Sequence, residues 1–417
     1  MPKPRILMVI TNLTFGGAQR VFEDHRRLLS QTCDVTEAVF NLADGHAFPG
    51  SAPVVDLGVG GGGSIFDKII NFAKRVHRLR KVKLRLEPAV CISHLEGADY
   101  VNVLSRHRER IVLCVHGSKL HDSNIRGVFG FVRRRILIPL LYNRADAIVT
   151  VSREIGIELQ ALGVRHSLIR PIHNFFDPLA IRQRAAMPLS EEEREIFSVP
   201  PVLVTSGRLT LQKNQAALIA LFAGLLKRRP VRLLLLGDGE LREKLVDQAR
   251  SLGLRVFDAA QGKPLKGEYD VYFLGFQDNP FRLQRHAQAF VLTSGWEGFP
   301  MVIGEAMACG LPIVSADCPT GPREFLAPDT LGKARGLPPE IENGEFGMLM
   351  PVPYEDDPAT IASWVEGLDR LLEQEDLRER MSAQSLARAE QFSRDAIGDQ
   401  WVALIEELIA SGSNASA

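Results

Sequence analysis

The sequence lacks the features that mark several large classes of protein. Its five cysteines form no C-x-x-C pair and their number is odd, so free thiols in a reducing cytosol fit better than disulfides or zinc. No apolar run approaches the ~20 residues that span a bilayer. The first residues, MPKPRILMVI, enter a strand-like run and lack the shape of a secretory signal. We therefore expect a cytoplasmic protein with no membrane-spanning helix.

The charge is balanced overall but not along the chain. The formal net charge is zero, yet residues 1–177 carry 25 Lys and Arg against 16 Asp and Glu. A run of cations without any acid lies between Asp67 and Glu87, and a second basic stretch lies at 127–144 among bulky apolar residues. The cations that we expect at a binding surface are Lys74, Arg75, Arg78, Lys81, Arg133, Arg134 and Arg135.

Basic amphipathic helices of this kind lie on anionic membrane surfaces. We therefore expect the first half of the chain to bind peripherally to the inner face of the cytoplasmic membrane. An ordinary solvated helix face beside a buried face is the alternative. Nucleic acid is not expected as a partner, because no recognised binding module accompanies the charge.

Apolar runs of strand length alternate with longer amphipathic stretches in two series. The first series lies at 5–10, 89–93, 110–115 and 147–151, and the second at 201–207, 231–237, 271–275, 289–294 and 312–316. Unbroken β-rich runs between helices indicate parallel sheets covered on both faces. The predicted fold class is therefore α/β, with two doubly wound, Rossmann-like domains.

The predicted domain boundaries follow from composition and length. A first domain is expected at 1–180, a linker rich in proline and charge at 181–200, and a second domain at 201–393. Two helices are expected to close the chain, near 358–391 and 394–411. We expect the second of these, with the tail to 417, to pack back on the first domain.

Two glutamates, Glu297 and Glu305, interrupt the apolar stretch GWEGFPMVIGEAMACGLPIV. A buried carboxylate is costly unless hydrogen bonds or an opposite charge compensate it. The stretch joins a predicted strand to a helix, and ligands bind at this edge of an open α/β sheet. Both carboxylates would then face a ligand with hydroxyl groups. The alternative is an ordinary ion pair with a nearby Arg or Lys.

The start of the same helix is a predicted anion site. Amides at a helix N-terminus point outward, and the helix dipole favours negative charge there. Upstream, Arg208 and Lys213 stand in SGRLTLQKN after another predicted strand, where two cations suit a diphosphate. Taken alone they would more often be a solvated helix start. The amides expected to bind the anion belong to Phe299, Met301 and Val302.

These motifs together resemble family 4 of the glycosyltransferases. GRLTLQKN, LLGDGELR, LGFQDNP, GWEGFPMVIGEAMACGLPIVSAD and NGEFGMLMP stand in that family's order and spacing. The resemblance covers nearly all of 201–355. It implies the GT-B fold, in which two Rossmann-like domains face each other across a cleft, and a retaining transfer from a nucleotide sugar.

The resemblance also implies roles for individual residues. Glu305 would bind the ribose hydroxyls of the nucleotide sugar, and Glu297 would hold hydroxyls of the donor sugar near the anomeric carbon. Arg208 and Lys213 would stabilise the departing diphosphate. A UDP-sugar is favoured over a GDP-sugar as co-substrate, and no cofactor is expected.

The first half resembles the family more loosely. Gly16 and Gly17, in TNLTFGGAQRVF, correspond to glycines that line the cleft beneath the diphosphate. His116, in VHGS, corresponds to a histidine that contacts the donor sugar. By themselves a Gly-Gly turn is only a turn, and a histidine after a strand is more often structural.

One further glycine motif is rejected. GVGGGGS contains G-x-G-x-x-G at Gly58, Gly60 and Gly63. A dinucleotide site would use the first strand of the unit, with an acidic residue at the end of the next strand. Here the next predicted strand ends in Ser-His, so NAD is not expected and the motif is interpreted as a flexible loop.

No Asp-x-Asp follows a strand of the first domain, so we expect no metal site and a transfer that proceeds in EDTA, with cations in place of Mg²⁺. DCPTGPREFL (317–326) resembles bacterial enzymes that build surface polysaccharides and lipid-linked oligosaccharides, which favours a lipid-linked acceptor over a soluble one. Two alternatives to the transferase stay open: a GT-B nucleotide-sugar epimerase and a non-catalytic membrane scaffold.

Overall fold

The structure, a computed structural model, describes residues 3–14, 16–45, 53–121, 127–198, 201–332 and 341–413. The chain divides into two compact units. The first comprises Met1–Phe175 together with Asp395–Ala417, and the second comprises Phe176–Arg394. The tail beyond residue 413 and the last two residues of the expected linker lie outside the described residues.

The first unit contains a seven-stranded sheet with the order β3-β2-β1-β4-β5-β6-β7. All of its strand pairs are parallel, as the unbroken apolar runs predict. The strands are β1 (Arg5–Ile10), β2 (Asp34–Val39), β3 (Val54–Asp56), β4 (Val90–His94), β5 (Arg110–Val115), β6 (Ala147–Thr150) and β7 (Ile169–Pro171).

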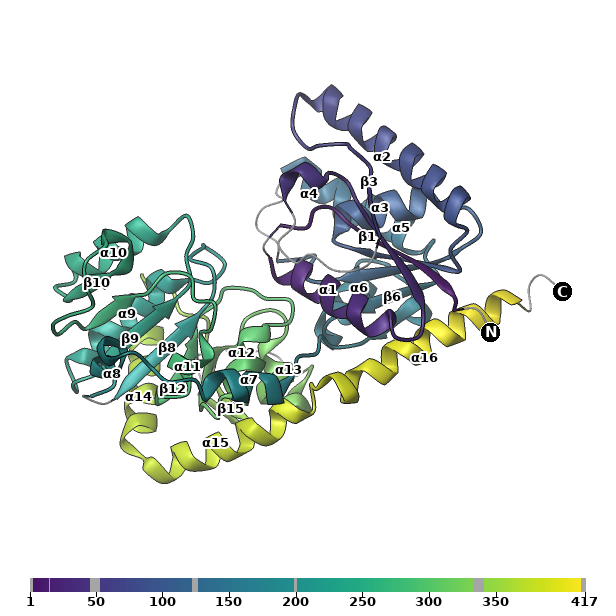
Figure 1. Ribbon diagram of the computed structural model, residues 1–417. Coiled ribbons are helices and arrows are strands. Elements are labelled where there is room, and N and C mark those ends of the chain that lie inside the picture. The colour runs from purple at the N-terminus through teal and green to yellow at the C-terminus, as the bar shows by residue number, and fades with distance from the viewer. Residues whose placement is uncertain are drawn as a thin grey trace. The chain divides into compact units, whose positions relative to one another are not determined.

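Helices cover both faces of this sheet (Figure 1). They are α1 (Gly17–Leu29), α2 (Ile65–Leu86), α3 (Glu96–Leu104), α4 (Gly127–Val132), α5 (Ile138–Tyr142), α6 (Arg153–Ala161) and α16 (Arg394–Ser413), with a π-helical turn (Arg133–Leu137) between α4 and α5 and 3₁₀ turns at Leu42–Asp44 and His166–Leu168. Side chains of α1 and α16 share one core with alternate residues of β1, β4 and β5. Side chains of α2 and α3 build a second core on the opposite face.

The second unit contains an eight-stranded sheet with the order β10-β11-β9-β8-β12-β13-β15-β14. Its pairs are parallel except that between β14 and β15. The strands are β8 (Val202–Ser206), β9 (Arg232–Leu236), β10 (Val256–Asp258), β11 (Val271–Phe273), β12 (Ala289–Leu292), β13 (Ile313–Ala316), β14 (Glu342–Gly344) and β15 (Gly347–Met350). Both units thus have the doubly wound, Rossmann-like core that the sequence predicts.

The helices of the second unit are α7 (Pro178–Ala185), α8 (Glu191–Ile196), α9 (Gln215–Leu226), α10 (Arg242–Ser251), α11 (Phe281–Gln284), α12 (Met301–Ala308), α13 (Pro322–Leu326), α14 (Pro358–Glu373) and α15 (Glu375–Glu390), with 3₁₀ turns at Ala259–Gln261 and Pro328–Thr330. No helix among the described residues is both long enough and apolar enough to cross a bilayer.

Two expectations about helices differ from the structure. The segment expected as a linker, 181–200, holds the end of α7 and the whole of α8, and α7 packs on α11 and α12. Ile181 and Ile196 are buried there, so this segment is part of the second unit's core. The single helix expected at 358–391 is two helices, because Gln374 adopts an extended backbone between α14 and α15.

Helix α16 returns to the first unit and completes its core. Trp401 is fully buried and lies with Ile405 and Leu408 in the same cluster as strands β1, β4 and β5. The ring of Trp401 contacts that of His25 on α1, with centroids 4.3 Å apart. The C-terminal helix therefore stabilises a sheet whose seven strands all lie within the first 171 residues.

Replacing Trp401 tests this role of α16. Trp401→Ala should destabilise the first unit by about 3–5 kcal/mol, because a buried aromatic ring is lost and a cavity is left. The measurement is hydrogen exchange of β1 peptides in increasing urea. Gln400→Ala, at the exposed neighbour on the same helix, is the control and should change little. Equal effects of the two variants would contradict the packing of α16 on this sheet.

Candidate functional site

An ion pair lies beyond the carboxyl ends of two neighbouring strands of the second unit. Lys213 follows β8 and Glu297 follows β12, and these strands pair directly. The Lys213 Nζ atom lies 2.6 Å from Glu297 Oε1. The Ser294 hydroxyl donates a second hydrogen bond of 2.6 Å to the same oxygen. Both ionic side chains are largely buried, at 16% and 7% exposure, so each compensates the charge of the other.

The backbone of Glu297 is fixed from another loop. Its amide donates to the carbonyl of Pro319 at 2.8 Å, and the Thr320 hydroxyl donates to its carbonyl at 2.6 Å. The loop that follows β13 thus holds the loop that follows β12. The sequence does not point to Ser294 or Thr320, because hydroxyl residues in loops carry no distinctive pattern.

Arg208 stands in a loop that packs tightly against the Gly-Asp-Gly turn after β9. The Leu209 amide donates to the Asp238 carbonyl at 3.0 Å, and a Cβ on Gly239 would lie only 2.4 Å from the Leu209 carbonyl oxygen. Glycine at this position is therefore required by the close approach of the two loops. The Arg208 side chain is exposed, and no partner for it lies in the described parts of the chain.

Helix α12 begins at Met301, directly after this loop. The amides of Met301 and Val302 belong to its first turn and have no acceptor within the helix. The Phe299 ring packs against Phe325, with centroids 4.3 Å apart. Glu305 is buried in the body of α12. The structure thus brings Arg208, Lys213, Glu297 and the start of α12 to one edge of one sheet.

The first unit has its own predicted site residues at the carboxyl ends of β1 and β5. Gly16 is the N-cap of α1, which starts at Gly17. His116 follows β5, and its Nε2 atom lies 2.9 Å from Nδ1 of His94, which ends β4. Burial, with a smaller contribution from Lys119, lowers the pKa of His116 to about 3. His116 is therefore uncharged at neutral pH.

A buried charge network lies beside His116. The Glu96 carboxylate accepts hydrogen bonds from Lys119 at 2.9 Å, from Arg133 at 2.6 Å and from the Tyr100 hydroxyl at 2.6 Å. Arg133 is 6% exposed, so its assignment to a surface is wrong: its guanidinium neutralises Glu96 inside the unit. The sequence gives no sign of this network, because its members are far apart along the chain.

The other predicted surface cations divide into two groups. Arg75 donates to the carbonyls of Val59 and Gly60, and Arg78 donates to those of Leu57 and Gly58. These two arginines therefore hold the loop at residues 57–60 against α2. Their guanidinium groups are partly occupied by these hydrogen bonds and are less able to bind a membrane surface. Lys74, Lys81 and Arg135 are exposed, and Arg134 is half-buried.

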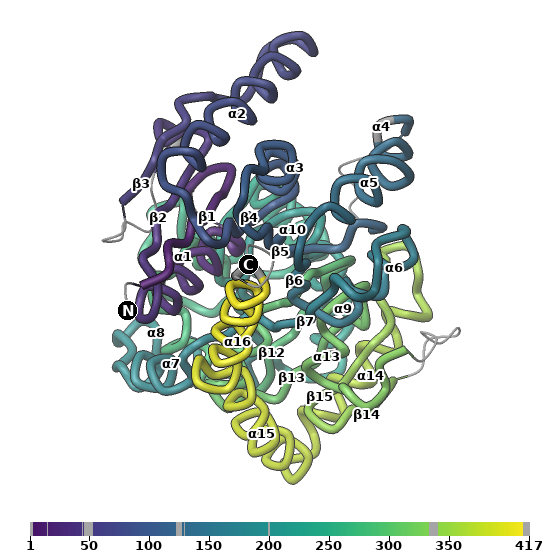
Figure 2. Tube along the Cα trace, turned by 90° about the vertical axis from the view of Figure 1, so that its right-hand side faces the viewer, coloured from purple at the N-terminus to yellow at the C-terminus, as the bar shows by residue number. Residues whose placement is uncertain are grey.

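Large apolar side chains are exposed beside these cations. The first half of α2 projects from the rest of the first unit (Figure 2), and Phe66 there is 78% exposed. Phe131 on α4 is 60% exposed. The exposed apolar side chains of the first half of α2 and of residues 127–144 are Ile65, Phe66, Ile69, Ile70, Val128, Phe131, Ile136, Leu137 and Leu140. Helical periodicity alone would have assigned most of these to the core.

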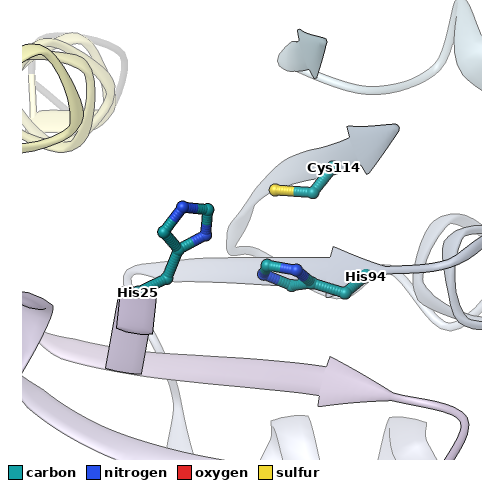
Figure 3. Close-up of side chains that lie close together, drawn as sticks. All are labelled: His25, His94 and Cys114. Atoms are coloured by element: carbon teal, nitrogen blue, oxygen red, sulfur yellow. The ribbon is translucent and has the colours of Figure 1, made fainter. Parts of the chain in front are cut away.

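Only one group of three or more His, Cys, Asp or Glu in the described ranges lies close enough together to hold a metal ion. It consists of His25, His94 and Cys114 in the first unit (Figure 3). None of the five cysteines forms a disulfide, and all but Cys309 are buried.

Comparison with known protein families assigns the chain. Residues 15–178 match Glycosyltransferase Family 4, and residues 188–388 match Glycosyl transferases group 1. The chain belongs to family 4 of the glycosyltransferases. The family that the motifs predict is therefore confirmed.

Two relatives of this glycosyltransferase span most of its length. An uncharacterized glycosyltransferase of Methanocaldococcus jannaschii is 29% identical over 367 residues, 81% of this chain and 84% of that protein. The N-acetylgalactosamine-N,N'-diacetylbacillosaminyl-diphospho-undecaprenol 4-alpha-N-acetylgalactosaminyltransferase of Campylobacter jejuni is 27% identical over 306 residues, 72% of this chain and 71% of that protein.

A solved structure has the same fold. Alr3699/HepE of Anabaena, in complex with UDP and glucose, superposes with a TM-score of 0.70 and 20% identity, covering 97% of this chain and 100% of that one. The glycosyltransferase therefore has the GT-B fold, as the motifs predict.

Glu96 gives the glycosyltransferase a testable acid sensitivity. Burial alone would raise the pKa of Glu96, but Lys119 and Arg133 lower it from 4.5 to about 2. The ionised carboxylate therefore stabilises the fold fully above pH 4.5, and this contribution is lost as the pH falls from 4.5 towards 2. A pKa difference of this size corresponds to roughly 3 kcal/mol of unfolding free energy.

We therefore expect Glu96→Gln to lose about 3 kcal/mol of unfolding free energy at pH 7. The difference from wild type should shrink as the pH falls below 4.5. Urea denaturation between pH 7 and pH 3 measures both effects, with Glu87→Gln, an exposed glutamate, as control. A variant as stable as wild type at pH 7 would show that the network contributes nothing.

Proposed function

We propose that this glycosyltransferase moves a hexose or N-acetylhexosamine, with retention, from a UDP-sugar to a hydroxyl of a lipid-linked saccharide. The observation that carries the proposal is the Lys213–Glu297 pair beside the exposed Arg208 at one sheet edge. These three side chains supply, at one site, cations for a diphosphate and a carboxylate for sugar hydroxyls. A non-catalytic scaffold would have no use for an exposed Arg208 beside the pair. An epimerase would give no glycosylated product, so detection of that product separates it from a transferase.

In the proposed mechanism the acceptor hydroxyl attacks the face of the anomeric carbon from which the diphosphate departs. The new bond forms between the acceptor oxygen and the anomeric carbon, and the bond to the diphosphate oxygen breaks. A departing phosphate oxygen takes the acceptor's proton. Arg208, Lys213 and the amides of Met301 and Val302 stabilise the charge that develops on the diphosphate. No metal ion takes part.

The remaining site residues bind the donor. We assign the ribose hydroxyls to Glu305, the hydroxyls near the anomeric carbon to Glu297, and a further sugar contact to the uncharged His116. Gly16 and Gly17 lie at the start of α1, where the backbone can approach a phosphate closely. The main-chain amide of Phe299 is assigned to the diphosphate with those of α12.

The proposed donor and acceptor classes are inferred from one structurally similar protein and one relative in sequence. The structurally similar Anabaena protein binds UDP, which supports UDP over GDP. The Campylobacter relative acts, by its name, on a diphospho-undecaprenol-linked sugar. We therefore propose a polyprenyl-diphosphate-linked saccharide as the acceptor class.

Donor binding is tested by thermal shift with UDP-, GDP- and ADP-sugars in EDTA. We expect UDP-sugars to raise the Tm of wild type and to have little effect on Glu305→Ala, because the ribose contact is lost. Glu243→Ala, at an exposed helix position in the same unit, should respond like wild type. A shift that requires a divalent metal, or that is equal in Glu305→Ala, would contradict the assignment.

Binding to an anionic membrane is part of the proposal. Lys74, Lys81 and Arg135 are exposed near the apolar side chains of α2 and α4. A surface that combines apolar side chains with cations binds lipid through both insertion and charge, at about 1 kcal/mol per cation. This would place the enzyme at the inner face of the cytoplasmic membrane, where a lipid-linked acceptor lies.

Vesicle flotation measures this binding. Wild type should float with vesicles that contain anionic lipid and much less with neutral vesicles. The double variant Phe66→Ser, Phe131→Ser should lose most of the flotation, whereas Ile157→Ser, an exposed apolar residue on α6 of the same unit, should retain it. Equal flotation of all three proteins would locate the membrane contact elsewhere.

A further inference from the structure

Three potential metal ligands converge inside the first unit. His25 comes from α1, His94 from the end of β4 and Cys114 from β5. All three are buried, and one ligand atom from each lies within 4.8 Å of the others. Figure 3 shows the two imidazole rings and the sulfur pointing into the same space.

The fold explains why they meet. Strands β4 and β5 are parallel neighbours, and His94 is in register with Cys114. Cys114 shares its face of the sheet with Val112 and Ile92, and α1 covers this face. His25 is 2% exposed on α1, and its ring lies 5.3 Å from that of His94. The register of two strands and the packing of one helix thus place three ligands at one point.

Three of the four ring nitrogens of His25 and His94 have no hydrogen-bond partner among the described residues. Both ring nitrogens of His25 and the Nε2 atom of His94 are buried without any partner among the described residues. A buried polar atom without a hydrogen-bond partner destabilises the fold. The neighbouring side chains are aromatic: the ring centroids of Trp401 and Phe175 lie 4.3 and 5.7 Å from that of His25. A bound ion would supply the partner that the described side chains do not.

His94 is also oriented as metal-binding histidines are. Its Nδ1 atom lies 2.9 Å from Nε2 of His116. A ligating histidine usually makes such a hydrogen bond with its second nitrogen, which fixes the ring and its tautomer. With the proton on Nδ1, the lone pair of Nε2 is directed to the other side of the ring.

We propose that His25, His94 and Cys114 bind one Zn²⁺ ion, taken up while the chain folds. Imidazole nitrogen and thiolate sulfur are both ligands that bind Zn²⁺, with Zn–N near 2.0–2.1 Å and Zn–S near 2.3 Å. Tetrahedral zinc holds its ligand atoms roughly 3.3–3.7 Å apart, so the side chains close by about 1 Å around it. The Cys114 thiol releases its proton to solvent, and a small non-protein ligand completes the coordination.

The ion would link α1 to β4 and β5 through their side chains, next to His116, which is hydrogen-bonded to His94. This structural role is separate from the proposed sugar transfer, and the zinc proposal does not rest on the proposed transfer mechanism. Sequence patterns gave no sign of it, because the three ligands are scattered over 90 positions of the chain and none is part of a recognised zinc motif.

Metal analysis of the full-length protein, expressed and refolded with Zn²⁺ and then dialysed, tests the proposal. We expect about one zinc per chain in wild type, and less than about a fifth of that in His25→Phe and in Cys114→Ser. Cys33→Ser, another buried cysteine of the same unit, and His107→Asn are controls and should retain the zinc. Wild type without bound zinc would overturn the proposal, as would full retention in both ligand variants.

Zinc-edge X-ray absorption on wild type keeps the test independent of how the variants fold. The expected first shell contains one sulfur near 2.3 Å and nitrogen or oxygen ligands near 2.0–2.1 Å. A shell without sulfur would exclude Cys114 and overturn the proposed site.

Discussion

The candidate site depends on one buried carboxylate. Glu297 lies in a loop at the carboxyl edge of the second sheet, at 6% exposure, where an ionised group needs compensation. Lys213 and Ser294 supply it, both at 2.6 Å. The pair requires β8 and β12 to be neighbours, which the strand order provides. Without that pairing, a cation and a carboxylate 84 positions apart in sequence would not meet.

The surrounding loops follow from the same arrangement. In a parallel sheet every strand ends at the same edge, so the loops after β8, β9, β12 and β13 converge there. Thr320 fixes the backbone of Glu297 from one side, and the turn at Gly239 supports the loop of Arg208 from the other. Hydrogen bonds between these loops hold an arrangement in which Arg208 is exposed, Lys213 is partly buried and Glu297 is buried. This combination suits a ligand that carries both a diphosphate and sugar hydroxyls.

Much of this could be predicted from the sequence, for identifiable reasons. Strands such as Arg5–Ile10 are continuous apolar runs, which only a doubly covered parallel sheet accommodates. The sequence does not predict β2, because Asp34, Thr36 and Glu37 interrupt its apolar run. In the structure Glu37 is buried and pairs with Arg26 at 3.0 Å. The burial of Arg133 and the convergence of His25, His94 and Cys114 depend on contacts between distant residues, which local patterns do not encode.

The most direct test of the account is the turnover of Arg208→Ala with a UDP-sugar donor in EDTA. Arg208 has no partner among the described side chains, so its removal should leave the fold intact. The account predicts that kcat falls by roughly 30- to 900-fold, which corresponds to about 2–4 kcal/mol of lost stabilisation of the leaving diphosphate. Lys227→Ala, an exposed lysine of the same unit, should turn over like wild type. Unchanged turnover in Arg208→Ala, or activity that depends on added Mg²⁺, would contradict a mechanism in which protein cations stabilise the diphosphate.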